Sequence, residues 1–506
     1  MIDCSRNGVM TAEKVREFAD LMAGMGYNML MLYTEDTYEI DGEPFFGYMR
    51  GRYSKAELKE LDAYCASKGI ELIPCIQTLA HLNSLRRWPV YEPMFDINDV
   101  LLAGDERVYR LIGKMFDTLA ECFTTRRVHI GMDEAHFVGL GRYLNEHGYT
   151  NRALLMAEHL KKVNEIAAER GFTTMIWSDM FIRLNNNGAY RGKDLKVPEE
   201  TVKAVPKGVE LVYWDYYSKD PEDYRDQFKA HLKFVNNPIA FAGGIWTWTG
   251  YAPSLTYSID ATKAALEAAK DVPMDTIFFT LWGDNGKDCS YFASLPAMFA
   301  AAELTKGNED FPSIERAFEE QTGYTFEEFM ALELPNVTSD ERSQNENPCK
   351  YLLFNDPFIG LYDFTVAPGL SERYKKAEAL LRASVNGRKY DYLFDFMSKL
   401  CGVLSLKCGL GIRIRTAYKA GDKKALKILA DETIPELLAR TEALYEAFRT
   451  VWLTENKPFG LEVEEARFGF LLLRLRSCRD RLTDYLEGRT ADIEELETEQ
   501  LPIRPE

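Results

Sequence analysis

The sequence predicts an α/β fold: a (β/α)₈ barrel of the TIM type, followed by an all-α C-terminal domain. Over the first 305 or so residues, short β-branched or aromatic runs alternate with longer segments of helical periodicity. Eight such strand–helix pairs are present, the number that a closed parallel barrel contains. Past about residue 308 the strand pattern stops, so we expect the barrel over 1–308 and a helical domain over 309–506.

The predicted strands are short and apolar, and several follow a glycine that ends the preceding helix. The stretches "MAGMGYNMLML" and "AAERGFTTMIW" show this junction, and glycine is typical of the position just past a helix. An open doubly wound sheet is the alternative, but it rarely contains eight such strands, and no G-x-G-x-x-G follows the first one. The strands are expected at 1–4, 28–33, 70–76, 128–132, 172–177, 209–214, 239–245 and 276–282.

The C-terminal segments are long, amphipathic and rich in Leu, Ala, Arg and Glu, as packed helices are. A polar stretch rich in Asn and Ser at 335–348 is expected to be a loop or linker. We expect the apolar stripes to form the core of the domain, with a homodimer interface as the alternative. The helices are expected at 371–386, 390–419, 422–453 and 459–487.

The bulk composition argues against several classes of protein. A formal net charge of -18 disfavours nucleic-acid or anionic-membrane partners, which clustered Lys and Arg would bind. No run approaches the roughly 20 apolar residues of a membrane span, and no apolar signal core opens the chain. Nine cysteines without paired spacing fit a reducing compartment, so we expect a cytoplasmic location. Neither C-x-x-C nor H-E-x-x-H occurs, so no metal or cofactor is expected.

Polar and aromatic residues gather where the predicted strands end, the edge at which barrel enzymes carry their active sites. Arg6 follows the first strand, Glu35 and Asp36 follow the second, and His81 follows the third. Aromatic faces stack on pyranose rings while carboxylates bind the hydroxyls, so a sugar site is expected. The acidic charge disfavours nucleobase stacking. Five of the seven tryptophans lie at these ends: Trp177, Trp214, Trp246, Trp248 and Trp282.

Two adjacent carboxylic acids, Asp133 and Glu134, end the fourth strand in "RRVHIGMDEAHF". Successive side chains of a strand point to opposite faces, so both acids reach one site only if the chain leaves strand geometry there. A solvated loop end is the structural alternative. Paired carboxyl groups among aromatic residues are typical of glycoside hydrolysis, in which one carboxyl protonates the leaving oxygen.

These motifs resemble those of glycoside hydrolase family 20, the β-N-acetylhexosaminidases. "HIGMDE" resembles the family's H-x-G-x-D-E motif. "DCSRN", "LYTED" and "IPCIQTLAHL" resemble its first, second and third strand motifs, and "LWGDNG" resembles its last-strand W-x-E motif. The motifs occur in the family's order over about residues 1–305. The resemblance implies an exo-acting retaining enzyme that removes terminal β-linked GlcNAc or GalNAc from small glycans without a metal or cofactor.

The resemblance also implies roles for individual residues. Glu134 would be the general acid and then the base, while Asp133 would orient the substrate's acetamido group and stabilise an oxazolinium-like intermediate. His81, with Glu35 or Asp36, would form a charge relay that tunes Glu134.

Substrate binding would fall to residues at the other strand ends. Arg6 would bind the O3/O4 side of the sugar, and Asp284 would bind O4 or O6 although many family members carry Glu there. The residue that contacts the acetamido oxygen is not assigned: Tyr213, Tyr216 and Tyr251 are the candidates. The full set of expected substrate-binding residues is Arg6, Trp177, Tyr213, Trp214, Asp215, Trp246, Trp248, Trp282 and Asp284.

Two alternatives stay open at this point. A different retaining glycosidase would use Asp215 or Asp284 as its nucleophile and would not need the 2-acetamido group. A non-catalytic sugar-binding protein would keep the tryptophans, and Glu134 would then be dispensable.

Overall fold

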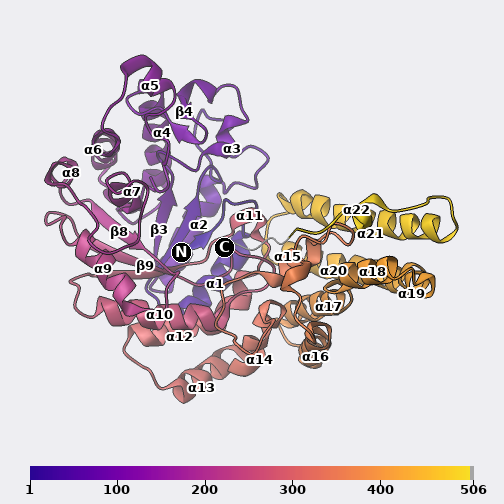
Figure 1. Cartoon of the computed structure of the whole chain (residues 1–506). Coiled ribbons are helices and arrows are strands. Elements are labelled where there is room, and N and C mark those ends of the chain that lie inside the picture. The colour runs from indigo at the N-terminus through magenta and orange to yellow at the C-terminus, as the bar shows by residue number, and fades with distance from the viewer. Residues whose placement is uncertain (502–506) are drawn as a thin grey trace. The chain divides into compact units, whose positions relative to one another are not determined.

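Eight parallel strands form one sheet that closes on itself. Its strands lie in the indigo to magenta part of the chain in Figure 1. The computed structural model describes residues 1–501. The sheet order is β1-β2-β3-β6-β7-β8-β9-β10. The strands are β1 (Ile2–Asp3), β2 (Met29–Thr34), β3 (Glu71–Ile76), β6 (Arg127–His129), β7 (Thr173–Trp177), β8 (Glu210–Trp214), β9 (Ile239–Gly244) and β10 (Thr276–Thr280).

The first and last strands meet through Leu281, which directly follows β10. The Asp3 amide donates to the Leu281 carbonyl at 3.0 Å, and the Leu281 amide donates to the Met1 carbonyl at 2.9 Å. Ile2 and Leu281 pair in parallel. The predicted (β/α)₈ barrel is therefore confirmed, although β6 is shorter than the expected strand 128–132.

The barrel helices begin and end where the sequence chemistry predicts. The side chain of Thr11 accepts a hydrogen bond at the start of α1, and Gly26 ends that helix with φ 85°. A left-handed φ of this kind costs glycine little, and it explains the helix–Gly–strand junction seen in the sequence. The main helices around the strands are α1 (Ala12–Met25), α2 (Lys55–Ser67), α4 (Glu106–Cys122), α6 (Arg152–Ala168), α8 (Glu199–Ala204), α9 (Pro221–His231), α10 (Leu255–Ala269) and α12 (Leu295–Thr305).

A short antiparallel ribbon of β4 (Phe95–Ile97) and β5 (Val100–Leu101) lies between β3 and α4, and the sequence did not predict it. The Leu101 amide donates to the Leu79 carbonyl at 2.8 Å, so the ribbon holds the segment after β3. Within its turn, Asp99 accepts a hydrogen bond from the His81 backbone amide at 3.0 Å. The ribbon therefore fixes the loop that carries His81.

The chain forms two compact units. The second contains Trp246–Tyr257, Asp284–Pro296 and the chain from Glu315 onward, so two short segments after β9 and β10 belong to it. The predicted helical C-terminal domain is confirmed, with one expected helix divided into α17 and α18. The boundary at 308/309 stays a prediction. The long helices are α16 (Leu370–Ala383), α17 (Asp391–Lys407), α18 (Leu410–Lys419), α20 (Ile434–Glu455) and α21 (Leu461–Leu486).

Within residues 1–501, no helix combines the length and the apolar character needed to cross a membrane. The expected cytoplasmic location and the homodimer stay predictions.

Candidate active site

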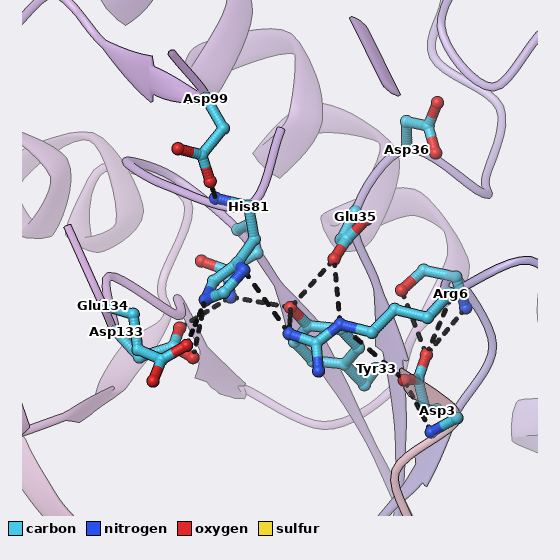
Figure 2. A network of polar contacts seen from close by, with 12 residues as sticks. Asp3, Arg6, Tyr33, Glu35, Asp36, His81, Asp99, Asp133 and Glu134 are labelled. Carbon is cyan, nitrogen blue, oxygen red and sulfur yellow. Dashed lines mark hydrogen bonds and ion pairs between the residues drawn. The ribbon is translucent and has the colours of Figure 1, made fainter. Parts of the chain in front are cut away.

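The backbone leaves strand geometry directly after β6, in the way that the adjacent acids require. Gly131, Met132 and Glu134 have φ values of 74°, 71° and 52°. These left-handed conformations turn both carboxyl groups toward one histidine (Figure 2). The Nε2 atom of His81 lies 3.1 Å from Asp133 Oδ2 and 3.7 Å from Glu134 Oε2. Such strained conformations in residues other than glycine are typical of functional sites.

Gln77, just past β3, holds this turn in place. Its Nε2 donates to Asp133 Oδ1 at 2.7 Å and to the Tyr33 hydroxyl at 2.9 Å. Its Oε1 accepts from the Met132 amide at 3.1 Å. A Cβ atom on Gly131 would lie 2.1 Å from the same Oε1, so only glycine allows Gln77 this close to the turn.

The ion pair between His81 and Asp133 sets the charge of both groups. Burial opposes protonation of His81, but the Asp133 charge and hydrogen bond outweigh it and raise the pKa of His81 to about 9. Although burial disfavours an ionised Asp133, His81 and the hydrogen bond from Gln77 hold the pKa of Asp133 well below its usual range. Asp133 is therefore an anion near neutral pH. The Glu134 side chain is 42% exposed, so it is open to a ligand.

Arg6 lies between Glu35 and His81 (Figure 2). Its Nε donates to Glu35 Oε1 at 3.4 Å, and its guanidinium lies 3.4 Å from His81 Nδ1. The Tyr33 hydroxyl also donates to Glu35 Oε1, at 3.2 Å. Burial raises the pKa of Glu35 to about 7, against the opposing charges of Arg6 and His81. The guanidinium carbon also lies 4.9 Å from the ring centre of Trp282, so aromatic and acidic groups together orient Arg6.

The structure pairs His81 differently from the predicted relay. Asp36 is bound by Arg50, whose Nε donates to Asp36 Oδ1 at 3.1 Å. Glu35 is bound by Arg6 and Tyr33. The carboxylates near the His81 ring nitrogens are those of Asp133 and Glu134, because Arg6 occupies the space toward Glu35. The direct contacts of His81 thus differ from the expected ones, and a relay from Glu35 or Asp36 that tunes Glu134 stays a prediction.

Asp179 is a buried carboxyl that the sequence places at the end of the fifth strand without indicating a role for it. Its Oδ2 accepts from the Glu134 backbone amide at 3.3 Å and from Arg183 Nε at 3.2 Å. Burial and the nearby Asp133 charge raise the pKa of Asp179 to about 7. The signal was present in "WSDM", where Asp179 follows the fifth strand by two positions.

Three of the predicted tryptophans form one buried row with Tyr216. Trp177 and Trp282 have ring centres 6.0 Å apart, and Trp282 Nε1 donates to the Tyr216 hydroxyl at 3.0 Å. Trp214 stacks on Tyr216 at 5.6 Å. The structure therefore brings Trp177, Trp214 and Trp282 close together, and their sugar-binding role stays a prediction.

Asp215, after β8, is fully enclosed by other groups. Its Oδ2 accepts from Arg191 Nε at 2.9 Å and from the Tyr213 hydroxyl at 3.2 Å, and its Oδ1 accepts from the Tyr217 amide at 3.1 Å. The Asp215 side chain has no exposed surface. Tyr213 is buried as well, so neither is presented to solvent in this structure.

Trp246, Trp248 and Asp284 belong to the second compact unit, while the residues described above belong to the first. Trp246 and Trp248 stack with ring centres 4.4 Å apart. Asp284 begins the short helix α11 (Asp284–Lys287). Their part in the site stays a prediction.

In the described part of the chain, one group of side chains has donor atoms close enough together that they could hold a metal ion. The ligand atoms of His81, Asp133 and Glu134 lie within 4.8 Å of one another. Their side chains already form the ion pairs described above. The expectation that no metal or cofactor takes part stays a prediction.

A barrel with adjacent carboxyl groups and a row of aromatic rings at its strand ends has the features of a glycoside hydrolase. Residues 1–238 match the family model described as "Glycosyl hydrolase family 20, catalytic domain". Residues 327–506 match the model "Glycoside Hydrolase 20C C-terminal domain". The chain belongs to glycoside hydrolase family 20, as the sequence motifs predicted.

Individual relatives are more distant. The chain is 25% identical over 209 residues to Hexosaminidase D of Homo sapiens, covering 40% of this chain and 41% of that protein. It is 30% identical over 165 residues to a β-hexosaminidase of Akkermansia muciniphila, covering 27% and 33%. The chain thus spans less than half the length of either relative.

A solved structure is also similar, the β-N-acetylhexosaminidase of Bacteroides fragilis. Its TM-score is 0.48 at 17% identity, covering 64% of this chain and 70% of that one. The family assignment rests on the two sequence matches and not on this similarity.

Proposed function

We propose that the protein is an exo-acting, retaining β-N-acetylhexosaminidase that removes terminal β-linked GlcNAc or GalNAc from small glycans. One observation carries the proposal. Two carboxyl groups meet at His81 Nε2, one of them held as an anion and the other open to solvent. Family membership and the hexosaminidase names of two relatives support the same activity.

In the first step, Glu134 gives its proton to the glycosidic oxygen as the bond from that oxygen to C1 breaks. The carbonyl oxygen of the substrate's own acetamido group attacks C1 from the opposite side, which yields an oxazolinium ion and the free alcohol. In the second step the Glu134 carboxylate removes a proton from water, and the water oxygen attacks C1 and opens the ring. Two inversions at C1 give retention, and neither step needs a metal or cofactor.

Asp133 supplies the charge that this mechanism requires. The oxazolinium ion carries a positive charge, and an anion fixed beside it stabilises it more than it stabilises the neutral substrate. His81 and Gln77 hold the Asp133 carboxylate in place before the substrate binds, so no reorganisation is needed at the moment of reaction. Asp179 fixes the backbone amide of Glu134 in the same turn.

Arg6 and the tryptophan row would bind the sugar. Arg6 is oriented by Glu35 and by the ring of Trp282, which leaves its guanidinium beside the acidic pair. Trp177, Trp214 and Trp282 provide the aromatic surface that pyranose rings prefer. Asp284, Trp246 and Trp248 keep their proposed substrate roles from the sequence motifs.

The enclosure of Asp215 argues against its use as a protein nucleophile. A nucleophilic carboxylate must reach C1, but Asp215 is covered and bound by three donors. The acetamido group of the substrate is the better nucleophile for this site.

The test is hydrolysis of a chromogenic β-GlcNAc glycoside by wild type, Glu134→Gln and Asp133→Asn, with the matching β-glucoside as control. We expect activity on the GlcNAc substrate only, with large losses in both variants. Equal turnover of the glucoside would exclude assistance by the acetamido group. Sugar binding without hydrolysis would identify the site as a receptor.

A further inference from the structure

A cluster of aromatic rings, two exposed and one half-buried, lies on the two loops that follow β2 and β3. Phe45 and Trp88 stack with ring centres 5.1 Å apart and 29° between the ring planes. Tyr48 meets Trp88 edge-on at 5.5 Å and Phe45 at 6.1 Å. Phe45 and Tyr48 are 41% and 46% exposed. We call these three residues the aromatic platform.

The loop that carries Phe45 and Tyr48 is closed at its base. Tyr38 and Tyr53 pair in parallel, the Glu39 amide donates to the Tyr53 carbonyl at 2.9 Å, and the Tyr53 amide donates to the Thr37 carbonyl at 2.9 Å. A loop whose ends are joined in this way forms a compact structure of its own and not a flexible connection.

The same loop rests directly on the candidate active site. A Cβ atom on Gly47 would lie 2.0 Å from the Asp36 carbonyl oxygen, so the loop backbone touches the acidic segment after β2. Arg50 of this loop binds the Asp36 carboxylate at 3.0 Å. The aromatic platform is therefore continuous with the segment that holds Arg6 through Glu35.

The second loop is tied to the first. The Tyr91 hydroxyl donates to Glu43 Oε2 at 2.9 Å, and Lys114 forms an ion pair with Glu43 at 2.6 Å. Trp88 lies seven positions after His81, on the loop that the β4–β5 ribbon holds. Both platform loops thus leave the strand ends from which site residues come, at the catalytic edge of the barrel.

We propose that the aromatic platform binds a pyranose ring in the leaving group of the substrate, so that the enzyme prefers a saccharide aglycone to a simple alkyl glycoside. This rests on the proposed function, because a leaving group exists only if the glycosidic bond is cleaved. The C–H face of a second sugar would stack on the outward face of Trp88 or of Phe45, since the two rings cover each other's inner faces. Trp88 is one of two tryptophans that lie away from the ends of strands five to eight, and this role gives it a function.

A sugar fits the platform better than a protein partner does. The exposed apolar surface of the two loops comprises the aromatic rings together with Met49 and Val90. Charged residues stand near them in the sequence: Glu43 and Arg52 in the first loop and Arg87 in the second. Flat rings flanked by hydrogen-bonding groups suit a hydroxyl-bearing ring, whereas stable protein interfaces bury a larger patch. A second copy of the chain is the competing occupant and is an outcome of the test.

The experiment compares kcat/KM for N,N′-diacetylchitobiose with kcat/KM for methyl β-N-acetylglucosaminide. In Trp88→Ala we expect the value for the disaccharide to fall about tenfold more than that for the methyl glycoside, since one stacking contact is lost. Trp88→Phe should recover part of the preference. Tyr149→Ala removes an exposed ring (76% exposed) from another loop and serves as the matched control, with no change in the ratio.

Equal losses on both substrates in Trp88→Ala, or self-association of wild type that this variant abolishes without changing the ratio, would overturn the proposal. If wild type hydrolyses neither substrate, the proposed function fails first. The platform is then tested by calorimetric titration of diacetylchitobiose into wild type and Trp88→Ala. Weaker binding to the variant would still support a sugar platform, and equal binding would refute it.

Discussion

Two acidic pairs follow strands of the barrel, and their surroundings give them opposite properties. Glu35 and Asp36 follow β2 and are bound by Arg6 and Arg50, so both side chains are nearly covered. Asp133 and Glu134 follow β6 and share His81. In this pair one carboxylate is held and the other is 42% exposed. Adjacent acids alone therefore do not define a catalytic pair, since the cations around them decide which carboxyl group is open.

The pKa shifts of Glu35 and Asp133 also distinguish the two pairs. Burial raises the pKa of Glu35 to about 7, whereas His81 and Gln77 hold the pKa of Asp133 below its usual range despite its burial. The difference arises because Asp133 receives two short contacts to its charged form, while the contacts to Glu35 are longer. Asp133 and Glu134, which we call the open pair, thus combine a fixed anion with an accessible acid.

The largest expected effect comes from Glu134→Gln. Loss of the general acid should lower kcat for a GlcNAc glycoside with a poor leaving group by about 10³-fold. Glu35→Gln is the matching change in the covered pair, Glu35 and Asp36. It should act mainly on KM, because Glu35 orients Arg6, the proposed sugar-binding residue. Steady-state kinetics of both variants checks this, and equal losses in kcat would mean that the two pairs do not differ in role.

Asp133→Asn comes next, with a fall in kcat of about 10²-fold, because the developing positive charge loses its fixed anion. A thiazoline analogue of the oxazolinium ion should bind this variant much more weakly than it binds wild type. Inhibition constants for the two proteins measure the difference. Unchanged affinity for the analogue would show that Asp133 does not interact with the intermediate.

Gly131→Ala tests the left-handed turn after β6 that carries Asp133 and Glu134. Its left-handed φ and the approach of Gln77 should lower the free energy of unfolding by about 2 kcal/mol or more. Gly208→Ala is the matched control, with φ 79° and open space around the added methyl group. That change should cost about 1 kcal/mol. Urea denaturation compares the free energies of unfolding of the two variants. Equal losses would show that the Gln77 side chain moves away from the added methyl group at little cost.

A further effect on stability is the pH dependence that Glu35 contributes. Its pKa is raised from 4.5 to about 7 on folding, so the folded state binds more protons and loses stability as pH rises through that window. Glu35→Gln should remove this loss, and its stability relative to wild type should rise between pH 4.5 and 7. Urea midpoints of both proteins across that range measure the trend, which a constant difference would contradict.

The sequence predicted the barrel well because its strands are apolar runs with glycine-ended helices before them. It also located the acidic pair, since an apolar strand that runs into Asp133 and Glu134 is unusual. It did not predict that His81 pairs with Asp133, because a strand end says nothing about which side chain of a neighbouring loop reaches it. Nor did it predict that Arg6 contacts both Glu35 and His81.

Other residues were missed for similar reasons. Tyr33 and Gln77 lie at the ends of β2 and β3 and read as ordinary polar residues, yet they hold Glu35 and Asp133. Asp179 acts through the backbone of Glu134, a contact that depends on the left-handed turn. The β4–β5 ribbon has strands of three and two residues, too short for a periodic pattern.

The most direct test of the account is the leaving-group dependence of Glu134→Gln. The 2,4-dinitrophenyl β-N-acetylglucosaminide needs no acid in the first step, whereas the methylumbelliferyl glycoside does. We predict that the burst of released dinitrophenol keeps most of its wild-type rate in Glu134→Gln, while the methylumbelliferyl rate collapses, and that Glu35→Gln changes both rates alike. Equal losses on both substrates in Glu134→Gln would show that Glu134 is not the acid and that the open pair has another role.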